Sequence, residues 1–236
     1  MSQPFDVRYT GAARTNIVDR RARFIVRTYN HLFGAIVAFA AIEFALFASG
    51  AAEGLVRAML GTSWLVVLGA FMLVSWIASH FAYSTTSRAA QYAGLGAYVV
   101  AQAIIFVPML YIANRIAPGT IQSAGIVTML GFGGLSAVAF ITRKDFSFLR
   151  GVLLYGGIIA LVLIVAGAIF GFQLGTFFSV AMVGFAGAAI LYDTSNVLHH
   201  FPEDRYVGAA LQLFSSVALL FWYVLRLMMS LQSRNN

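Results

Sequence analysis

The sequence of 236 residues contains no cysteine. This absence excludes disulfide bridges, thiolate metal sites and a cysteine nucleophile. Charge is also scarce: only 10% of the residues are charged, whereas 61% are hydrophobic. A soluble domain is about a quarter charged and about half apolar. The composition therefore predicts an all-α, polytopic membrane protein with no separate soluble domain.

Catalytic and metal-binding motifs are missing as well. The sequence has no nucleophile elbow, no zinc-protease motif and no nucleotide-binding loop. His199 and His200 are adjacent, so on a helix their side chains would point about 100° apart, and no second pair of ligands accompanies them. We therefore expect no enzyme activity, no metal site and no cofactor.

Long apolar runs separated by turn-forming residues predict seven membrane spans. A span needs about 20 apolar residues, and runs of this length lie at 31–50, 62–83, 91–113, 120–142, 148–170, 174–197 and 207–230. We accordingly expect a seven-helix bundle over residues 31–230, preceded by an Arg-rich N-terminal tail (1–30) and followed by a short C-terminal tail (231–236).

Small residues predict where these helices pack closely. Only a turn separates the fifth run from the sixth, so the two should form a helical hairpin. The spacings Gly167-x-x-x-Gly171 and Gly171-x-x-x-Gly175, with the cluster Gly184, Gly187 and Ala188, favour close approach of helix backbones.

Basic residues concentrate before the first span. The formal net charge is +7, and six of the fifteen basic residues fall in this segment: Arg8, Arg14, Arg20, Arg21, Arg23 and Arg27. The segment does not resemble a secretory signal peptide. Its charge predicts a cytoplasmic N-terminus and contact with anionic lipid of the bilayer, not nucleic acid. Arg226 lies inside the last run, so the side of the C-terminus stays open.

Four ionisable side chains fall within predicted spans: Glu43, His80, Asp193 and Arg226. Such residues are costly in a bilayer and normally face a bundle interior or a wet cavity. Asp193 has Asn196 and His200 at i+3 and i+7, on one helical face. The last run carries Gln212, Ser215 and Ser216, and the two polar stripes can face each other across a hydrated seam. We predict an ion or proton site there, formed by Asp193, Asn196, His200, Gln212 and Ser216.

Each of these residues also has a structural interpretation. Asp193 can instead lie at the membrane interface, with its carboxylate in headgroup water and Asn196 at the helix end. Glu43 lies past the middle of its run, where a hydrogen bond to a neighbouring helix is the alternative to a functional role. His80 shares a helical face with Trp76, and lining a cavity is the hypothesis for it.

Two segments together resemble the Bax inhibitor-1 family. TRKDFSFLRGVLL (142–154) resembles the loop between the fourth and fifth spans of that family. AILYDTSNVLHH (189–200), followed by ALQLFSSVALLFWYVLRLM (210–228), resembles its signature at the last two spans. Val26-Arg27-Thr28-Tyr29 is closest to the bacterial YccA branch.

The resemblance implies a seven-helix bundle in the bacterial inner membrane that acts as a pH-sensitive calcium leak. In the family pattern, carboxylates on the sixth and seventh helices share a proton, and their mutual repulsion tunes the response to pH. The first position matches Asp193, whereas the second falls on Ser216. Because serine carries no charge, the paired-carboxylate sensor is not expected here.

The YccA branch implies a second function, modulation of the FtsH membrane protease without transport. In that case the Arg-rich tail would engage the protease, and Asp193 would be structural. A channel needs the hydrated seam, whereas a protease modulator needs the tail and an exposed helix face.

Overall fold

The computed structural model describes residues 7–84 and 87–235, with side chains over 19–83 and 87–232. Within this part of the chain every regular element is an α-helix: α1 (Val7–Ala48), α2 (Ala51–Leu60), α3 (Trp64–Ser84), α4 (Arg88–Ile116), α5 (Thr120–Thr142), α6 (Leu149–Phe170), α7 (Thr176–His199) and α8 (Tyr206–Asn235). Among these described helices, seven are long and apolar enough to cross a membrane, all but α2. The predicted all-α membrane fold is confirmed.

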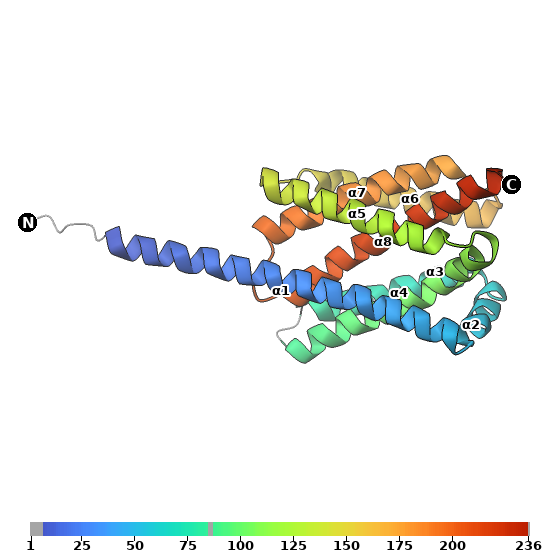
Figure 1. Ribbon diagram of the computed structural model, residues 1–236, viewed down its shortest axis with the longest axis horizontal. Helices are drawn as coiled ribbons and strands as arrows, with labels where there is room; N and C mark the ends of the chain where they lie inside the picture. The colour runs from blue at the N-terminus through green and yellow to red at the C-terminus, as the bar shows by residue number, and fades with distance from the viewer. Residues whose placement is uncertain (1–6, 85–86, 236) are drawn as a thin grey trace, which may run out of the picture.

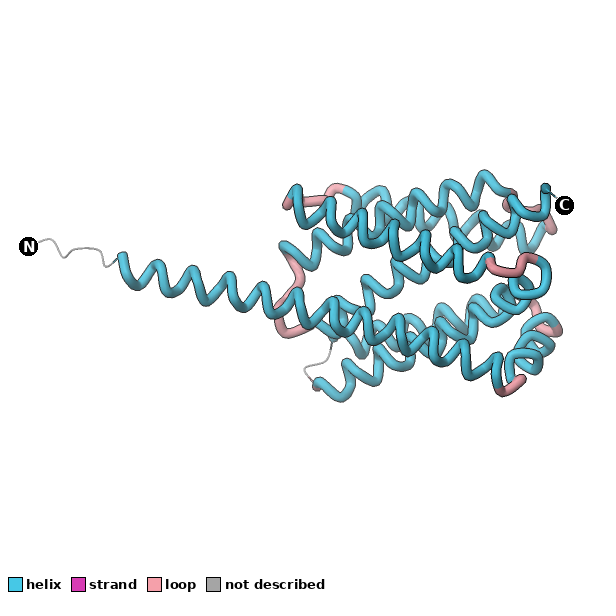
Figure 2. Tube along the Cα trace, in the orientation of Figure 1, coloured by secondary structure: helices cyan, strands magenta, loops and turns pink. Residues whose placement is uncertain are grey.

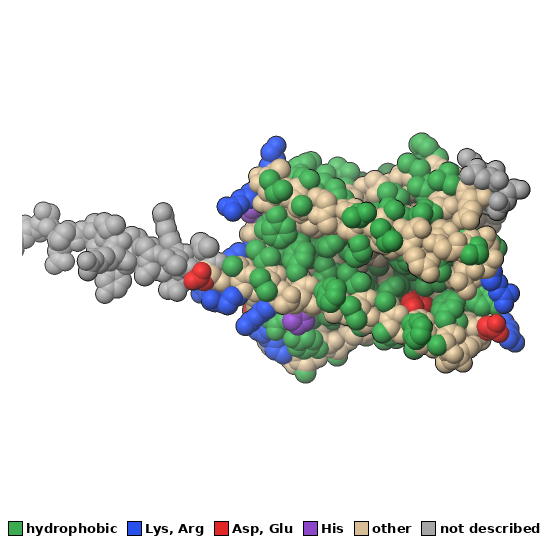
Figure 3. All heavy atoms as spheres, viewed as in Figure 1, with side chains coloured by type: hydrophobic (Ala, Val, Ile, Leu, Met, Phe, Trp, Pro, Cys, Tyr) green, Lys and Arg blue, Asp and Glu red, His purple; other side chains and the backbone are tan. Residues whose placement is uncertain are grey.

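The long helices alternate in direction along one axis (Figures 1 and 2). The loops at 143–148 and 200–205 lie at one end of the bundle, which we call the basic end. The opposite end, which we call the distal end, carries α2 and the loop at 171–175. Blue side chains gather at the basic end in Figure 3, and the middle of the visible surface is mostly hydrophobic.

The first helix is longer than predicted. α1 begins at Val7, and its candidate span covers Asp19–Ala48, so it passes residue 30 without a break. Phe24 is 2% exposed, and its ring stacks on Phe201 with centroids 6.3 Å apart. The helix therefore packs on the bundle before the predicted start of the span. The division into a tail and a membrane domain at residue 30 stays a prediction.

The short helix α2 was not predicted, since it falls between the first two predicted spans, 31–50 and 62–83. α1 ends at Ala48, and Gly50, in the left-handed region at φ 77°, directly precedes the first residue of α2. Ala52 and Val56 are buried in a cluster with Val107 of α4. This amphipathic helix has only ten residues, whereas a membrane span needs about 20 apolar residues. Long apolar runs therefore do not indicate it.

Helix α8 forms the centre of the bundle and packs against α1, α3, α4, α5 and α7. Its side chains at Leu211, Leu213 and Leu225 are almost completely buried. By contrast, α6 packs mainly on α7, as the predicted hairpin requires, and exposes large apolar side chains. Most of α8 is therefore surrounded by other helices and not by lipid.

Candidate functional site

Asp193 of α7 is buried against α8 and is 5% exposed. Gln212 donates from Nε2 to Asp193 Oδ1 at 2.5 Å, and the Ser216 hydroxyl donates to Oδ2. Gln212 and Ser216 are four residues apart, so both side chains leave the same face of α8. We call these three residues the Asp193 cluster. The alternative position for Asp193, at the membrane interface with its carboxylate in headgroup water, is therefore not the one observed.

The two residues after Asp193 contact other parts of the bundle. The Thr194 hydroxyl lies 3.4 Å from the Ser136 hydroxyl of α5. Ser195 Oγ accepts a hydrogen bond from the backbone N–H of Phe146 at 2.9 Å. Successive residues of a helix point about 100° apart, so three consecutive side chains reach α8, α5 and the 143–148 loop. This contact brings together two of the segments on which the family resemblance depends.

His200 lies outside the Asp193 cluster, which corrects its expected place in the seam. It follows the last residue of α7, and its exposed ring places Nε2 2.9 Å from Asp145 Oδ2. The backbone N–H of Ser147 donates to Asp145 Oδ1 at 2.8 Å. The hydrogen bond from Ser147 and then that from His200 lower the pKa of Asp145. The predicted stripe is broken because α7 ends before the i+7 position.

Asn196 has a structural place at the same helix end. Its side chain is half-buried, and its backbone carbonyl accepts from the backbone N–H groups of His200 and Phe201 at 2.9 and 2.8 Å. These bonds close the last turn of α7. Asn196 therefore lies close to the Asp193 cluster in the sequence, but the contacts of its backbone carbonyl are those that end α7.

Arg21 also caps α7, a role that sequence reasoning did not predict. Its Nε donates to the carbonyl of Leu198 at 3.0 Å, and its Nη1 donates to that of Phe201 at 2.6 Å. A cation at a helix C-terminus satisfies carbonyls that have no partner within the helix. The sequence contains no local signal for this contact, because Arg21 and Leu198 are 177 positions apart.

Glu43 and His80 lie apart from the Asp193 cluster. Glu43 of α1 is 7% exposed, and neither carboxylate oxygen has a hydrogen-bond partner among the described residues. The structural alternative for Glu43, a hydrogen bond to a neighbouring helix, is thus not formed among the described residues. The His80 ring stacks on Trp76, with centroids 6.1 Å apart. His80 is not among the residues that line the large cavity described next.

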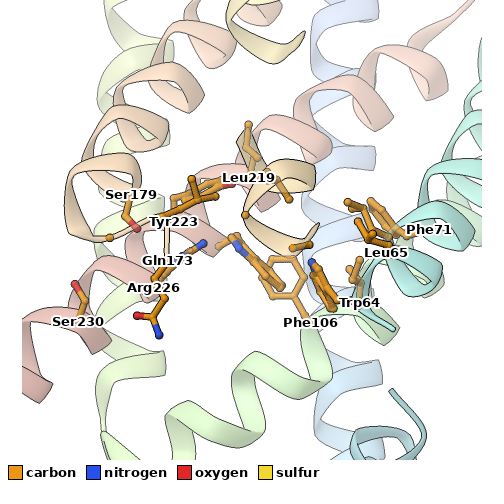
Figure 4. A pocket seen from close by; sticks show the side chains of 18 of the residues that line it. Trp64, Leu65, Phe71, Phe106, Gln173, Ser179, Leu219, Tyr223, Arg226 and Ser230 are labelled. Atoms are coloured by element: carbon orange, nitrogen blue, oxygen red, sulfur yellow. The ribbon is translucent and has the colours of Figure 1, made fainter. Parts of the chain in front are cut away.

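A cavity of about 950 Å³ lies among α3, α4, α6, α7 and α8, and we call it the distal cavity (Figure 4). Its lining extends from Trp64 and the 172–175 loop, at the distal end, to Tyr98 and Ser215. The Tyr98 hydroxyl donates to Ser215 Oγ at 2.8 Å. Ser215 precedes Ser216 of the Asp193 cluster, so the cavity ends next to that cluster.

The distal cavity also contains polar groups that sequence analysis had not connected with it. Gln102 lines the cavity, is 8% exposed, and its Oε1 has no hydrogen-bond partner among the described side chains. Arg226 lines it as well. No group of three or more metal-ligating side chains was found in the described part of the chain.

Comparison with known proteins gives a match over most of the chain. The family model described as inhibitor of apoptosis-promoting Bax1 matches residues 21–234. An uncharacterized protein of Pseudomonas aeruginosa is 38% identical over 110 residues, which are 45% of this chain and 48% of the relative.

Two relatives carry functional names. The modulator of FtsH protease YccA of Escherichia coli is 35% identical over 95 residues, 40% of this chain and 43% of the relative. Bax inhibitor 1 of Schizosaccharomyces pombe is 32% identical over 121 residues, 49% of this chain and 44% of the relative. The chain spans about half the length of the curated relatives it matches.

Proposed function

Since this chain belongs to the Bax inhibitor-1 family, we propose that it is a gated cation leak, permeable to calcium, whose closed state is held by the Asp193 cluster. The membrane would be a bacterial inner membrane, with the N-terminus in the cytoplasm. The observation that carries the proposal is a buried carboxylate hydrogen-bonded by two side chains of the next helix, one of which, Ser216, follows Ser215 in the lining of a cavity of about 950 Å³.

The arrangement of polar atoms supports passage of a cation. The distal cavity provides a route through part of the bundle, lined near its inner end by Tyr98, Gln102 and Ser215. Beyond it, Asp193, Gln212 and Ser216 offer oxygen atoms, the ligand type that calcium prefers. A stable calcium site takes six to eight oxygens, so this smaller set suits transient binding during conduction, which requires that the ion also leave.

Protonation of Asp193 would change how α7 and α8 are joined. A carboxylate accepts both hydrogen bonds, whereas a protonated carboxyl group carries one O–H donor of its own. The Ser216 hydroxyl can rotate and accept a hydrogen bond from that O–H. Gln212 can accept such a bond only if its amide turns so that the oxygen faces Asp193. A pH response can therefore arise from one carboxylate, without a second at position 216.

The test is calcium flux from vesicles containing the purified full-length chain, measured between about pH 5 and pH 8, a range in which buried carboxyl groups in proteins titrate. We expect flux in the wild type that changes with pH. Asp193→Asn should raise the flux and remove most of its pH dependence, because an amide can accept at only one of its two positions and cannot ionise.

The matched control is Asp204→Asn, which changes an exposed carboxylate in the loop between α7 and α8. Its flux should equal that of the wild type. Absence of calcium flux from both wild type and Asp193→Asn would contradict the leak. Calcium flux that is equal in the wild type and in Asp193→Asn would support a leak but contradict gating by the Asp193 cluster.

A second function, modulation of the FtsH protease, is favoured by the name of the Escherichia coli relative, modulator of FtsH protease YccA. For this function the Arg-rich segment before the bundle would engage the protease. A deletion of residues 1–18 removes part of that segment and keeps Arg21 and Phe24, which pack on the bundle. Capture of purified FtsH by the full chain should be lost in this deletion and kept in Asp193→Asn. Equal capture by both variants would contradict the role of the segment.

A further inference from the structure

The distal cavity has a polar side and an apolar side. Figure 4 shows Gln173, Ser179, Tyr223, Arg226 and Ser230 on one side and Trp64, Leu65, Phe71 and Phe106 on the other. Aromatic rings make up most of the second group. A ligand that complements both sides must itself be amphipathic.

The charge on the polar side comes from Arg226. It is half-buried within the candidate span Tyr206–Gln232, and no carboxylate in the described part of the chain forms an ion pair with it. An arginine at membrane depth is costly and is normally paired. The planar guanidinium matches a carboxylate or phosphate, to which it can donate two parallel hydrogen bonds.

We propose that the distal cavity binds an anionic, single-chain amphiphile. The carboxylate of a long-chain fatty acid, or the phosphate of a lysophospholipid, would pair with Arg226. The acyl chain would lie along Trp64, Phe71 and Phe106. The cavity volume of 950 Å³ is at the upper end of the range of about 300–1,000 Å³ typical of small-molecule sites. This proposal does not depend on whether the chain conducts ions.

The three tryptophans of the chain provide the readout. Trp64 and Trp222 line the distal cavity, whereas Trp76 lies outside it and is 68% exposed. The double variant Trp64→Phe/Trp76→Phe leaves Trp222 as the reporter. A dibrominated stearate quenches a tryptophan that it contacts, so quenching of Trp222 in the full-length protein, in nonionic detergent, reports occupancy of the cavity.

We expect saturable quenching at neutral pH. Arg226→Gln should raise the half-saturating concentration about tenfold or more, because the anion then loses its charged hydrogen-bond partner. The uncharged methyl ester of the same acid should bind about as weakly to the parent protein. Arg57→Gln removes a cation at the distal end that is 81% exposed and paired with Glu53, and it should leave the curve unchanged.

A second variant tests the cavity independently of charge. Ala168 of α6 lines the cavity, and Ala168→Phe should weaken quenching by filling space while leaving Arg226 in place. Melting curves of both variants separate lost binding from lost folding. Unlabelled stearate and unlabelled lysophosphatidate serve as competitors, and the stronger competitor identifies the source of the anion. The proposal would be overturned by quenching that does not saturate or that neither competitor reduces. It would also be overturned if the acid quenched Arg226→Gln, or the methyl ester quenched the parent protein, as strongly as the acid quenches the parent protein.

Discussion

Glu43 and Asp193 are both buried carboxyl side chains, but their surroundings differ. Both oxygens of Asp193 accept hydrogen bonds from α8, whereas neither oxygen of Glu43 has such a partner among the described residues. Glu43 lies one turn from Phe39 and from Phe47, which pack in the same apolar cluster. At the scale of single residues, Glu43 is thus a polar interruption of an otherwise apolar face.

Glu43→Leu should stabilise the protein. The substitution removes an unsatisfied buried polar group, whose desolvation penalty is about 1–3 kcal/mol, and completes the apolar face between Phe39 and Phe47. The measurement is the thermal midpoint in detergent, which should rise. Glu43→Gln, which keeps a polar group in place, should change it much less. A lower midpoint for Glu43→Leu would show that the carboxyl group has a partner or water that stabilises the fold.

Spacing along the helices predicted the contacts of Asp193, because Gln212 and Ser216 lie on one face of a neighbouring antiparallel helix. The same reasoning failed for His200. Its position depends on where α7 ends, and helix ends are poorly defined by hydropathy. The capping contact of Arg21 with Leu198 depends on how α1 crosses the bundle, which no local pattern in the sequence reports.

At the scale of helices, the closest backbone approach occurs at glycines that the small-residue spacings did not indicate. A Cβ on Gly94 of α4 would lie 2.5 Å from the backbone oxygen of Ala78 of α3. By contrast, a Cβ on Gly184 would meet nothing within 4 Å. The spacing rule finds small residues, but which of them face a partner depends on the rotation of each helix in the bundle.

Gly94→Ala should therefore destabilise the pair formed by α3 and α4. Backbone atoms cannot move aside as a flexible side chain can, so we expect a loss of about 1–3 kcal/mol from overpacking. Gly96→Ala, two residues along the same helix and with open space around its Cβ, is the control. Alanine is the better helix former, so this control should be neutral or slightly stabilising. Equal thermal midpoints for the two variants would contradict the close approach.

The contact between the 143–148 loop and α7 should depend on pH. Because the pKa of Asp145 is lowered in the folded protein, its contribution to stability is present above its ordinary pKa of about 4 and is lost as pH falls through the lower folded value. The thermal midpoint of the wild type should exceed that of Asp145→Asn at neutral pH. The difference should shrink on acidification below about pH 4. A difference that stays constant down to about pH 2 would rule out this contribution.

At the scale of the whole molecule, the positions of the membrane spans along the chain agree with those predicted from hydropathy. The predicted runs and the observed helices differ by only a few residues, except at the start of α1. Runs of about 20 apolar residues suffice to define spans because the bilayer core has a fixed thickness. The placement of α8 at the centre could not be predicted in the same way, since every span is apolar and only packing distinguishes an inner helix from an outer one.

The distribution of basic residues predicts the orientation in the membrane. The chain lacks cysteine, so single substitutions can be labelled selectively. Lys144→Cys lies in the 143–148 loop at the basic end, and Ala51→Cys lies at the start of α2 at the distal end; both positions are exposed. A membrane-impermeant maleimide should label Ala51→Cys from the periplasmic side and Lys144→Cys only after the membrane is disrupted. The reverse pattern would place the N-terminus outside.

The three-way attachment of Asp193, Thr194 and Ser195 limits how the bundle can open. A twist of α7 about its own axis would break its links to α8, to α5 and to the 143–148 loop at the same time. Sideways displacement of α6, which packs on α7 through apolar side chains such as Ala160 and Met182, would leave all three intact. If the protein has an open state, α7 is therefore the fixed part of the mechanism, and spectroscopic distance labels should be placed on the helices that move around it.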